Sequence, residues 1–97
     1  MKLSLTRQAA QELAEGARFY AREVDAQLAQ DFIAAFERSA QLLLGQPRLG
    51  AVWRGPVRRL PLRRFPYSII YVLNAEEVRV LALAHHSRKP GFWRGRV

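Results

Sequence analysis

The sequence predicts an α+β fold with an N-terminal strand, an antiparallel helix hairpin and then a three-stranded antiparallel meander, both helices packing on one sheet face. Three observations support this order. Apolar residues recur at steps of three and four through the first half, two apolar runs follow in the second half, and residues 45–56 between them are rich in glycine and proline. A chain of 97 residues suits one domain. We therefore expect residues 1–97 to form a single domain with a basic tail at residues 85–97.

The first expected element is a short strand that joins the sheet, because Leu3 and Leu5 alternate with polar residues. Thr6, or alternatively Ser4, can cap the helix that follows, roughly Arg7 to Glu23. This helix presents one apolar face, made of Ala10, Leu13, Ala17, Tyr20 and Val24.

A second helix is expected from Ala26 to Leu44, with Asp25 as its N-cap and Gly45 at its end. Because the joint between the helices is short, they should form an antiparallel hairpin whose apolar stripes are buried on the sheet. Gly16 is interpreted as a close packing contact, since an interior glycine otherwise costs about 1 kcal/mol relative to alanine. Phe19 lies off the apolar stripe and either wraps the helix pair or contacts a partner.

Residues 45–56 are predicted to be a connecting loop, in which Trp53 either anchors the loop on the domain or contacts a partner. The next run, Arg58 to Leu62, is the first strand of the meander. Pro61 withdraws one ladder donor, which favours an edge position or a bulge for this strand. The run turns its leucines to one face, while the opposite face carries Arg59 and Arg63.

The two apolar runs, Tyr67 to Leu73 and Val78 to Ala84, suit a hairpin joined by a four-residue loop, Asn74 to Glu77. Both faces of these runs are mostly apolar, so the first run should lie inside the sheet rather than at its edge. The expected pairs on one face are Leu73 with Val78, Tyr71 with Val80, Ile69 with Ala82 and Tyr67 with Ala84.

Charge is concentrated in the second half of the chain. The formal net charge is +8, and residues 51–97 contain only two acids, Glu76 and Glu77, among many arginines. Such a surface suits an acidic partner or nucleic acid, although a merely solvated basic surface is the alternative. The absence of cysteine permits a reducing compartment, and no apolar run is long enough to span a bilayer, so we expect a cytoplasmic protein with no membrane partner.

Three stretches in order resemble the RelE/ParE superfamily of toxins from bacterial type II toxin-antitoxin modules, and ParE more closely than RelE. They are QPRLG after the second helix, RRLPLRRFPYSIIYVL, and VRVLALAHHSRKPGFW. The resemblance implies a small cytoplasmic protein encoded with an antitoxin whose C-terminal segment wraps and neutralises it. RelE-like members are ribosome-dependent nucleases that cut mRNA, whereas ParE-like members are similar in fold but poison DNA gyrase.

The nuclease activity implied by a RelE-like protein needs fixed cations and a group that exchanges a proton near neutral pH. RelE-like members place basic residues on the second strand, an arginine after the last strand, and a tyrosine or histidine in the tail. Arg59 and Arg63 match the first position, and Arg88 matches the second. The third position holds residues that exchange no proton at neutral pH, namely Phe92, Trp93 and Arg94.

His85 and His86 are the remaining candidates for a general acid or base. Because adjacent strand residues point to opposite faces, at most one of them can share a site with Arg59 and Arg63. If the protein is a nuclease, its catalytic residues are expected among Arg59, Arg63, His85, His86 and Arg88. This geometry and the lack of cysteine argue against a metal site, and no cofactor is expected.

The basic, aromatic tail beside an arginine-rich strand favours a binder over a nuclease. We therefore expect a toxin that binds and inhibits DNA gyrase and is held by a cognate antitoxin. Two alternatives stay open: an mRNA endonuclease that acts on the ribosome, and a non-toxic basic nucleic-acid-binding module. The expected target-binding residues are Arg59, Arg63, Arg64, Arg88, Lys89, Phe92, Trp93 and Arg94.

Overall fold

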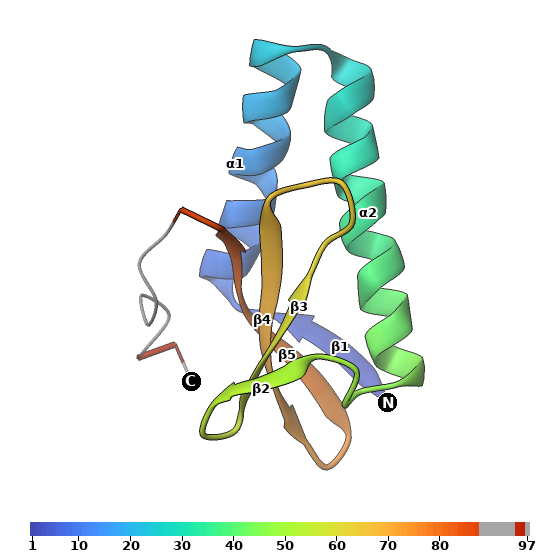
Figure 1. The fold of residues 1–97 in the computed structure, drawn as a ribbon, viewed down its shortest axis with the longest axis vertical. Helices are drawn as coiled ribbons and strands as arrows, with labels where there is room; N and C mark the ends of the chain where they lie inside the picture. The colour runs from blue at the N-terminus through green and yellow to red at the C-terminus, as the bar shows by residue number, and fades with distance from the viewer. Residues whose placement is uncertain (88–94, 97) are drawn as a thin grey trace.

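A computed structural model describes residues 1–87, 95 and 96 of the chain. Within them the elements follow the order β1 (Lys2–Leu5), α1 (Arg7–Glu23), α2 (Ala26–Gly45), β2 (Ala51–Arg54), β3 (Val57–Pro61), β4 (Tyr67–Asn74) and β5 (Glu77–His85) (Figure 1). The predicted α+β class, with a strand and a helix hairpin ahead of the antiparallel strands, is confirmed.

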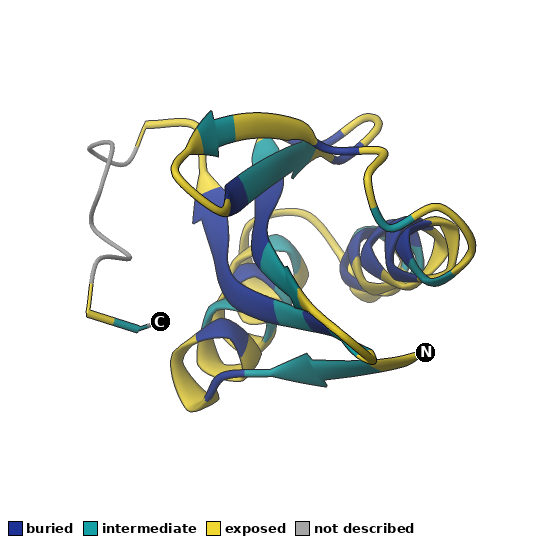
Figure 2. Ribbon diagram, turned by 90° about the horizontal axis from the view of Figure 1, so that it is seen from below, coloured by how far each residue is buried: buried dark blue, intermediate teal, exposed yellow. Residues whose placement is uncertain are grey.

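The strands form one sheet in the order β1-β5-β4-β3-β2. β1 runs parallel to β5, and the other neighbours are antiparallel. The helix pair lies against one side of this sheet (Figures 1 and 2). β4 lies between β5 and β3, so its predicted internal position is confirmed.

The meander has four strands, and the prediction of three was wrong. β2 occupies part of the predicted loop and pairs with β3 as an edge strand. Its residues are mostly exposed, including Val52, so the alternation of apolar and polar positions that marks a half-buried strand is missing. Gly55, with a φ of 51°, lies in the turn from β2 to β3, where a side chain would be strained.

β3 is therefore an internal strand, and it pairs with β4 without a bulge at Pro61, so the expectation of an edge position or a bulge there was wrong. Pro61 is nevertheless compatible with it, because the pairing of β3 with β2 extends only from Val57 to Arg59, while Pro61 pairs with Ser68 of β4 alone. The missing amide proton thus falls where β3 has a single neighbour.

The hairpin of β4 and β5 contains a bulge that the expected register lacked. Leu73 pairs with Val78 and Tyr71 with Val80 as predicted, but the register then shifts between Ile70 and Tyr71. The extra residue on β5 is Leu81. Beyond it the observed pairs differ from the prediction and join Ile70 with Ala82, Ile69 with Leu83, Ser68 with Ala84, and Tyr67 with His85.

The loop of this hairpin is also shorter than predicted, because Asn74 and Glu77 pair with each other and only two residues connect the strands. In addition, the side-chain amide of Asn74 donates to the Glu77 carboxylate at 3.1 Å. The nearby Ser4 hydroxyl and the Asn74 amide hold the pKa of Glu77 below its ordinary value, with Ser4 contributing most.

Both helix N-caps are those predicted. The Thr6 hydroxyl accepts from the Ala9 amide at 3.0 Å, and the Asp25 carboxylate accepts from the Leu28 amide at 2.8 Å. The Thr6 hydroxyl also donates to the carbonyl of Leu81 at 2.9 Å, so the start of α1 is fastened to β5. Each such cap stabilises its helix by about 1 kcal/mol.

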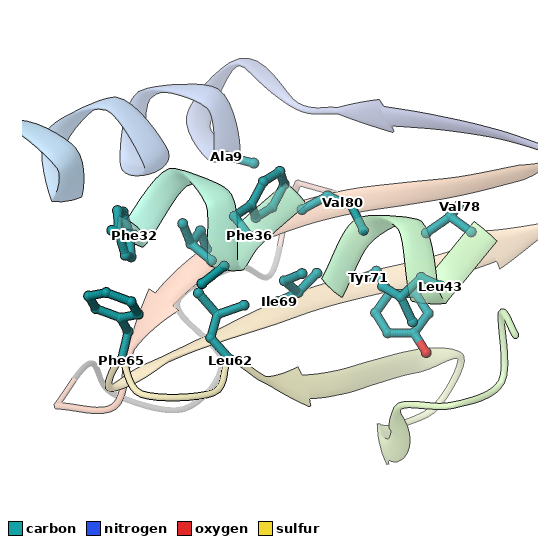
Figure 3. Packing of buried hydrophobic residues seen from close by; sticks show 13 residues of the cluster. Ala9, Phe32, Phe36, Leu43, Leu62, Phe65, Ile69, Tyr71, Val78 and Val80 are labelled. Carbon is teal, nitrogen blue, oxygen red and sulfur yellow. The ribbon is translucent and has the colours of Figure 1, made fainter. Parts of the chain in front are cut away.

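The main core lies between the helix pair and the sheet (Figure 3). Ring contacts join α1, α2 and the sheet here, because Tyr20 and Phe32 each contact both Phe65 and Tyr67 with centroids 4.8 to 6.5 Å apart. Gly16 fits this cluster as predicted, since a Cβ at that position would lie 2.7 Å from the ring of Phe32. The sequence interpretation of Gly16 as a close packing contact is confirmed.

A second apolar cluster lies on the sheet face opposite the helices, which we name the second face. Its members are buried, and Trp53 and Val72 pack against them. The bulge in β5 explains its composition, because Ala82 and Ala84 turn to this face while Leu83 joins the main core. The members of the cluster are Val57, Ile70, Leu81, Ala82 and Ala84.

The segment after α2 is clamped by Tyr71 and Arg58. The Tyr71 hydroxyl accepts from the Gly50 amide at 2.9 Å and donates to the Pro47 carbonyl at 2.8 Å. The Arg58 guanidinium donates to the Gly50 carbonyl at 2.8 Å. A Cβ on Gly50 would lie 2.6 Å from the Tyr71 hydroxyl, so only glycine allows this approach.

Alkaline pH should destabilise the fold. Burial raises the pKa of all three tyrosines, Tyr20, Tyr67 and Tyr71, above the ordinary value of 10.0. The folded state thus retains phenolic protons that the unfolded state releases, so stability is full below pH 10 and falls as pH rises above it. Urea unfolding between pH 8 and pH 11 should show a falling midpoint. Phenols that titrate near 10 in the folded protein, with a constant midpoint, would contradict this.

None of the helices in the described part of the chain is long and apolar enough to cross a bilayer.

Candidate target-binding surface

A row of three polar side chains crosses the second face from β3 to the end of β5. The Arg59 Nε donates to the Ser68 hydroxyl at 3.2 Å, and the same hydroxyl lies 3.0 Å from the His86 Nε2. Ser68 is 2 % exposed, whereas His86 is exposed. We name these residues the Arg59 row; they combine a fixed cation with an imidazole at the surface.

The sheet register places the members of the row. Arg59 pairs with Ile70, while Ser68 pairs with both Pro61 and Ala84, so β4 presents Ser68 beside Arg59 on the second face. Just past the end of β5, the amide of His86 donates to the carbonyl of Pro66 at 2.8 Å. This bond continues the hairpin by one residue and brings the imidazole to Ser68.

The two histidines point apart, as expected from their adjacency. The ring of His85 packs edge-on against Tyr67 with centroids 5.1 Å apart, and its Nδ1 lies 2.8 Å from the Ser87 hydroxyl. Only His86 shares a site with Arg59. His85 instead borders a cavity of about 320 Å³ on the α1 side, which is lined by Glu12, Glu15, Gly16, Phe19, Tyr67, Leu83, His85 and Ser87.

Trp53 supports the row from β2. The guanidinium carbon of Arg59 lies 5.8 Å from the centre of the Trp53 ring, a separation at which a cation is attracted to an aromatic face. Trp53 also packs against the apolar cluster of the second face, which agrees with its interpretation as an anchor. The guanidinium of Arg59 is therefore restrained on two sides, by an aromatic ring and by a hydroxyl.

The neighbouring arginines, including the predicted Arg63 and Arg64, lie elsewhere or serve the fold. Arg64 has a φ of 75°, forms an ion pair with Asp31 of α2 at 3.5 Å, and places its guanidinium 5.1 Å from the Phe65 ring. It therefore faces the helices and is not gathered with Arg59. Arg63 is exposed in the connection from β3 to β4, and Arg58 is used to clamp the segment after α2.

Five expected target-binding residues lie outside the described part of the chain: Arg88, Lys89, Phe92, Trp93 and Arg94.

The described end of the tail is fastened to α1 and β5. The Arg96 Nη1 donates to the Glu12 carboxylate at 2.9 Å and to the Leu81 carbonyl at 3.2 Å. The same Glu12 oxygen accepts from the Leu83 amide at 3.1 Å. These side chains are 15 % and 14 % exposed, so this is a largely buried ion pair. Sequence reasoning missed this pair, because nothing in the pattern links residues so far apart.

Ser68 was also missed as a site residue, although a signal existed. It is the only serine or threonine in the central run from Tyr67 to Leu73, which is otherwise made of aliphatic residues and tyrosine. A buried hydroxyl needs a hydrogen-bond partner, and this one links Arg59 to His86. Among the residues that the structure describes, no three His, Asp or Glu side chains cluster as metal ligands would.

Comparison with known proteins agrees with this fold. A family model described as "ParE toxin of type II toxin-antitoxin system, parDE" matches residues 3–90. A solved structure titled "Chromosomal ParDE TA system from P. aeruginosa" superposes with a TM-score of 0.78 at 24% sequence identity, covering 88% of this chain and 95% of that chain. No curated protein sequence matches the chain.

Proposed function

Because the chain belongs to the ParE toxin family of type II toxin-antitoxin systems, we propose that it binds and inhibits DNA gyrase in the cytoplasm. A cognate antitoxin neutralises it there. The observation that carries this proposal is the Arg59 row, in which one cation is held in place by Ser68 and Trp53 and is accompanied by a single histidine.

Such a row is better suited to binding than to cleavage of RNA. A metal-independent nuclease needs several fixed cations and two groups that exchange protons around the reacting phosphate. In the described part of the chain, Arg59 has one histidine near it, and Arg64 faces the helices. A restrained guanidinium, by contrast, loses little conformational entropy when it meets an acidic group on a target.

On this proposal the target-binding surface joins Arg59 and Arg63 to the tail residues Arg88, Lys89, Phe92, Trp93 and Arg94. The tail supplies aromatic anchors between cations, a combination common at the centre of interfaces. Arg64 belongs to this set by its charge alone, since its contacts are with α2.

The antitoxin proposal rests on charge and on exposed apolar side chains. The formal net charge of +8 attracts an acidic segment, and α2 exposes the apolar residues Ile33 and Leu42. An acidic and partly amphipathic antitoxin segment, disordered until it binds, fits both features.

The test measures DNA supercoiling by gyrase with the purified, antitoxin-free protein. We expect inhibition, and we expect Arg59→Ala to raise the concentration needed for half inhibition about tenfold, because a charge-assisted contact is lost. The matched control is Arg38→Ala, which removes an exposed arginine of α2. Normal supercoiling at saturating wild-type protein would refute the proposal.

The mRNA endonuclease is the alternative that a specific observation favours, because His86 lies beside Arg59 through Ser68. It predicts mRNA cleavage in a reconstituted translation mixture that His86→Ala abolishes and His85→Ala leaves intact. Intact mRNA together with blocked supercoiling would exclude it.

A further inference from the structure

We infer that the Arg59 row is a binding site for a nucleic-acid phosphodiester, in which Arg59 and His86 together bind one phosphate group. The inference rests on the proposed function and deepens it, because it names the chemical group that Arg59 meets on its target. It goes beyond the presence of basic charge and assigns named donor atoms to the ligand.

The hydrogen bonds within the row assign its donors and acceptors. A serine hydroxyl has one proton and two lone pairs. Arg59 Nε must donate, so it occupies a lone pair of Ser68. Among the described residues the hydroxyl proton has no other acceptor, so we assign it to His86 Nε2. In this arrangement Nε2 of His86 is the acceptor and Nδ1 carries a proton, a tautomer assigned from the network.

Every side-chain polar atom of the row that makes no hydrogen bond with a described residue is then a donor. The two Nη nitrogens of Arg59 and the Nδ1 of His86 form no hydrogen bond with another described residue, and no described carboxylate contacts them. Ser68 is buried and its hydroxyl is already used, so it positions its neighbours and does not touch the ligand. A surface with donors alone recognises an anion.

Two features favour a phosphodiester over a carboxylate. The Arg59 guanidinium, 5.8 Å from the centre of the Trp53 ring, has the planar fork that suits phosphate and nucleic-acid recognition. The net charge of +8 also attracts a polyanion such as DNA over a long range. A protein carboxylate is accordingly an outcome that the experiment must exclude.

The experiment measures the affinity of the full chain for a fluorescent single-stranded DNA dodecamer at fixed low salt, by anisotropy. We expect Arg59→Ala to weaken binding about tenfold and His86→Ala about threefold, whereas Arg38→Ala weakens it less than about twofold. Arg38→Ala is the matched control, since it removes the same charge from an exposed position on α2. Equal losses for Arg59→Ala and Arg38→Ala would show diffuse attraction and overturn the site.

Competition identifies the chemical source of the anion. Inorganic phosphate at millimolar concentration should displace the dodecamer only weakly. A polyglutamate peptide with the same charge as the dodecamer should displace it equally from the wild-type protein and from Arg59→Ala. Displacement by polyglutamate that Arg59→Ala abolishes would overturn the phosphodiester in favour of a carboxylate partner. Strong displacement by inorganic phosphate would assign the site to free phosphate and overturn the nucleic acid.

Nitrogen NMR of the histidines gives a readout that does not depend on affinity. The chain has two histidines, and His86 should show an unprotonated Nε2 and a protonated Nδ1 that shifts when the dodecamer is added. A His86 proton on Nε2 would contradict the assigned network.

Gyrase inhibition is assayed separately from DNA binding, so the two proposals can fail independently. DNA binding at Arg59 without gyrase inhibition would refute the proposed function alone. Gyrase inhibition without DNA binding would refute this inference alone.

Discussion

Replacement of Glu12 by alanine should lower the free energy of unfolding by about 3 kcal/mol. The Glu12 carboxylate accepts from both Arg96 and the Leu83 amide, and its side chain is 14 % exposed. Its removal leaves a guanidinium and a strand amide without this acceptor in a region largely shielded from water. Removing one partner of such a pair costs the free energy of a buried polar group that has lost its hydrogen bond. Urea unfolding followed by circular dichroism measures the change.

Glu15 provides the matched control, because it is an exposed glutamate one turn further along the same helix. Glu15→Ala should change stability by less than about 0.5 kcal/mol. The double variant with Arg96→Ala then tests the pairing itself, since a coupled pair gives less than the sum of its single losses. Equal and small losses for Glu12→Ala and Glu15→Ala would show that the contact with Arg96 contributes nothing to stability.

The second large effect is expected for Tyr71→Phe, which should cost about 2 kcal/mol. Tyr71 is fully buried, and its hydroxyl is the partner of both the Gly50 amide and the Pro47 carbonyl. The substitution keeps the ring in the core and removes both hydrogen bonds, so the loss comes from the two backbone groups. Hydrogen exchange at the Gly50 amide should become faster in the variant.

Tyr20→Phe separates this effect from the general loss of a phenol. Tyr20 also packs against the main core and makes ring contacts there. Its hydroxyl, however, forms no hydrogen bond with another residue in the described ranges. It should lose less than about 0.5 kcal/mol. Unchanged protection of the Gly50 amide in Tyr71→Phe would mean that the clamp is not maintained by the hydroxyl.

The helices were predictable because the signals that define them are local. Thr6 and Asp25 are caps whose partners lie three residues away, and the apolar stripes repeat within one turn. The predicted start and end of α1, Arg7 and Glu23, are those observed, and α2 extends one residue past the prediction to Gly45. The internal place of β4 was predictable for a similar reason, since both of its faces are apolar.

The sheet register was not predictable, because a bulge leaves no local pattern. Leu81 is an apolar residue among apolar residues, so a sequence with or without a bulge there looks the same. Its effect is nevertheless large, since it moves Ala82 and Ala84 to the second face and pairs Tyr67 with His85. β2 escaped prediction because an exposed edge strand of four residues carries no alternation.

The candidate site was partly predictable. The shared face of Arg59 with one of two histidines follows from strand geometry, but the choice of His86 depends on the bulge and on its bond to Pro66. The ion pair of Arg64 with Asp31 depends on a left-handed backbone at Arg64, which cannot be predicted from the sequence because arginine rarely adopts this conformation. Pairing between Glu12 and Arg96 joins the first helix to the end of the chain, a distance over which sequence pattern carries no information.

The pairing of the first strand with the last has a consequence for synthesis of the protein. Leu3 pairs with Val78 and Leu5 with Val80, and Thr6 bonds to Leu81. β5 is therefore the strand that β1 pairs with, and β1 cannot join the sheet until β5 has left the ribosome. Such long-range pairing folds late and comparatively slowly. A nascent chain therefore has an incomplete sheet until β5 has been made, and the second face with its Arg59 row forms only after that.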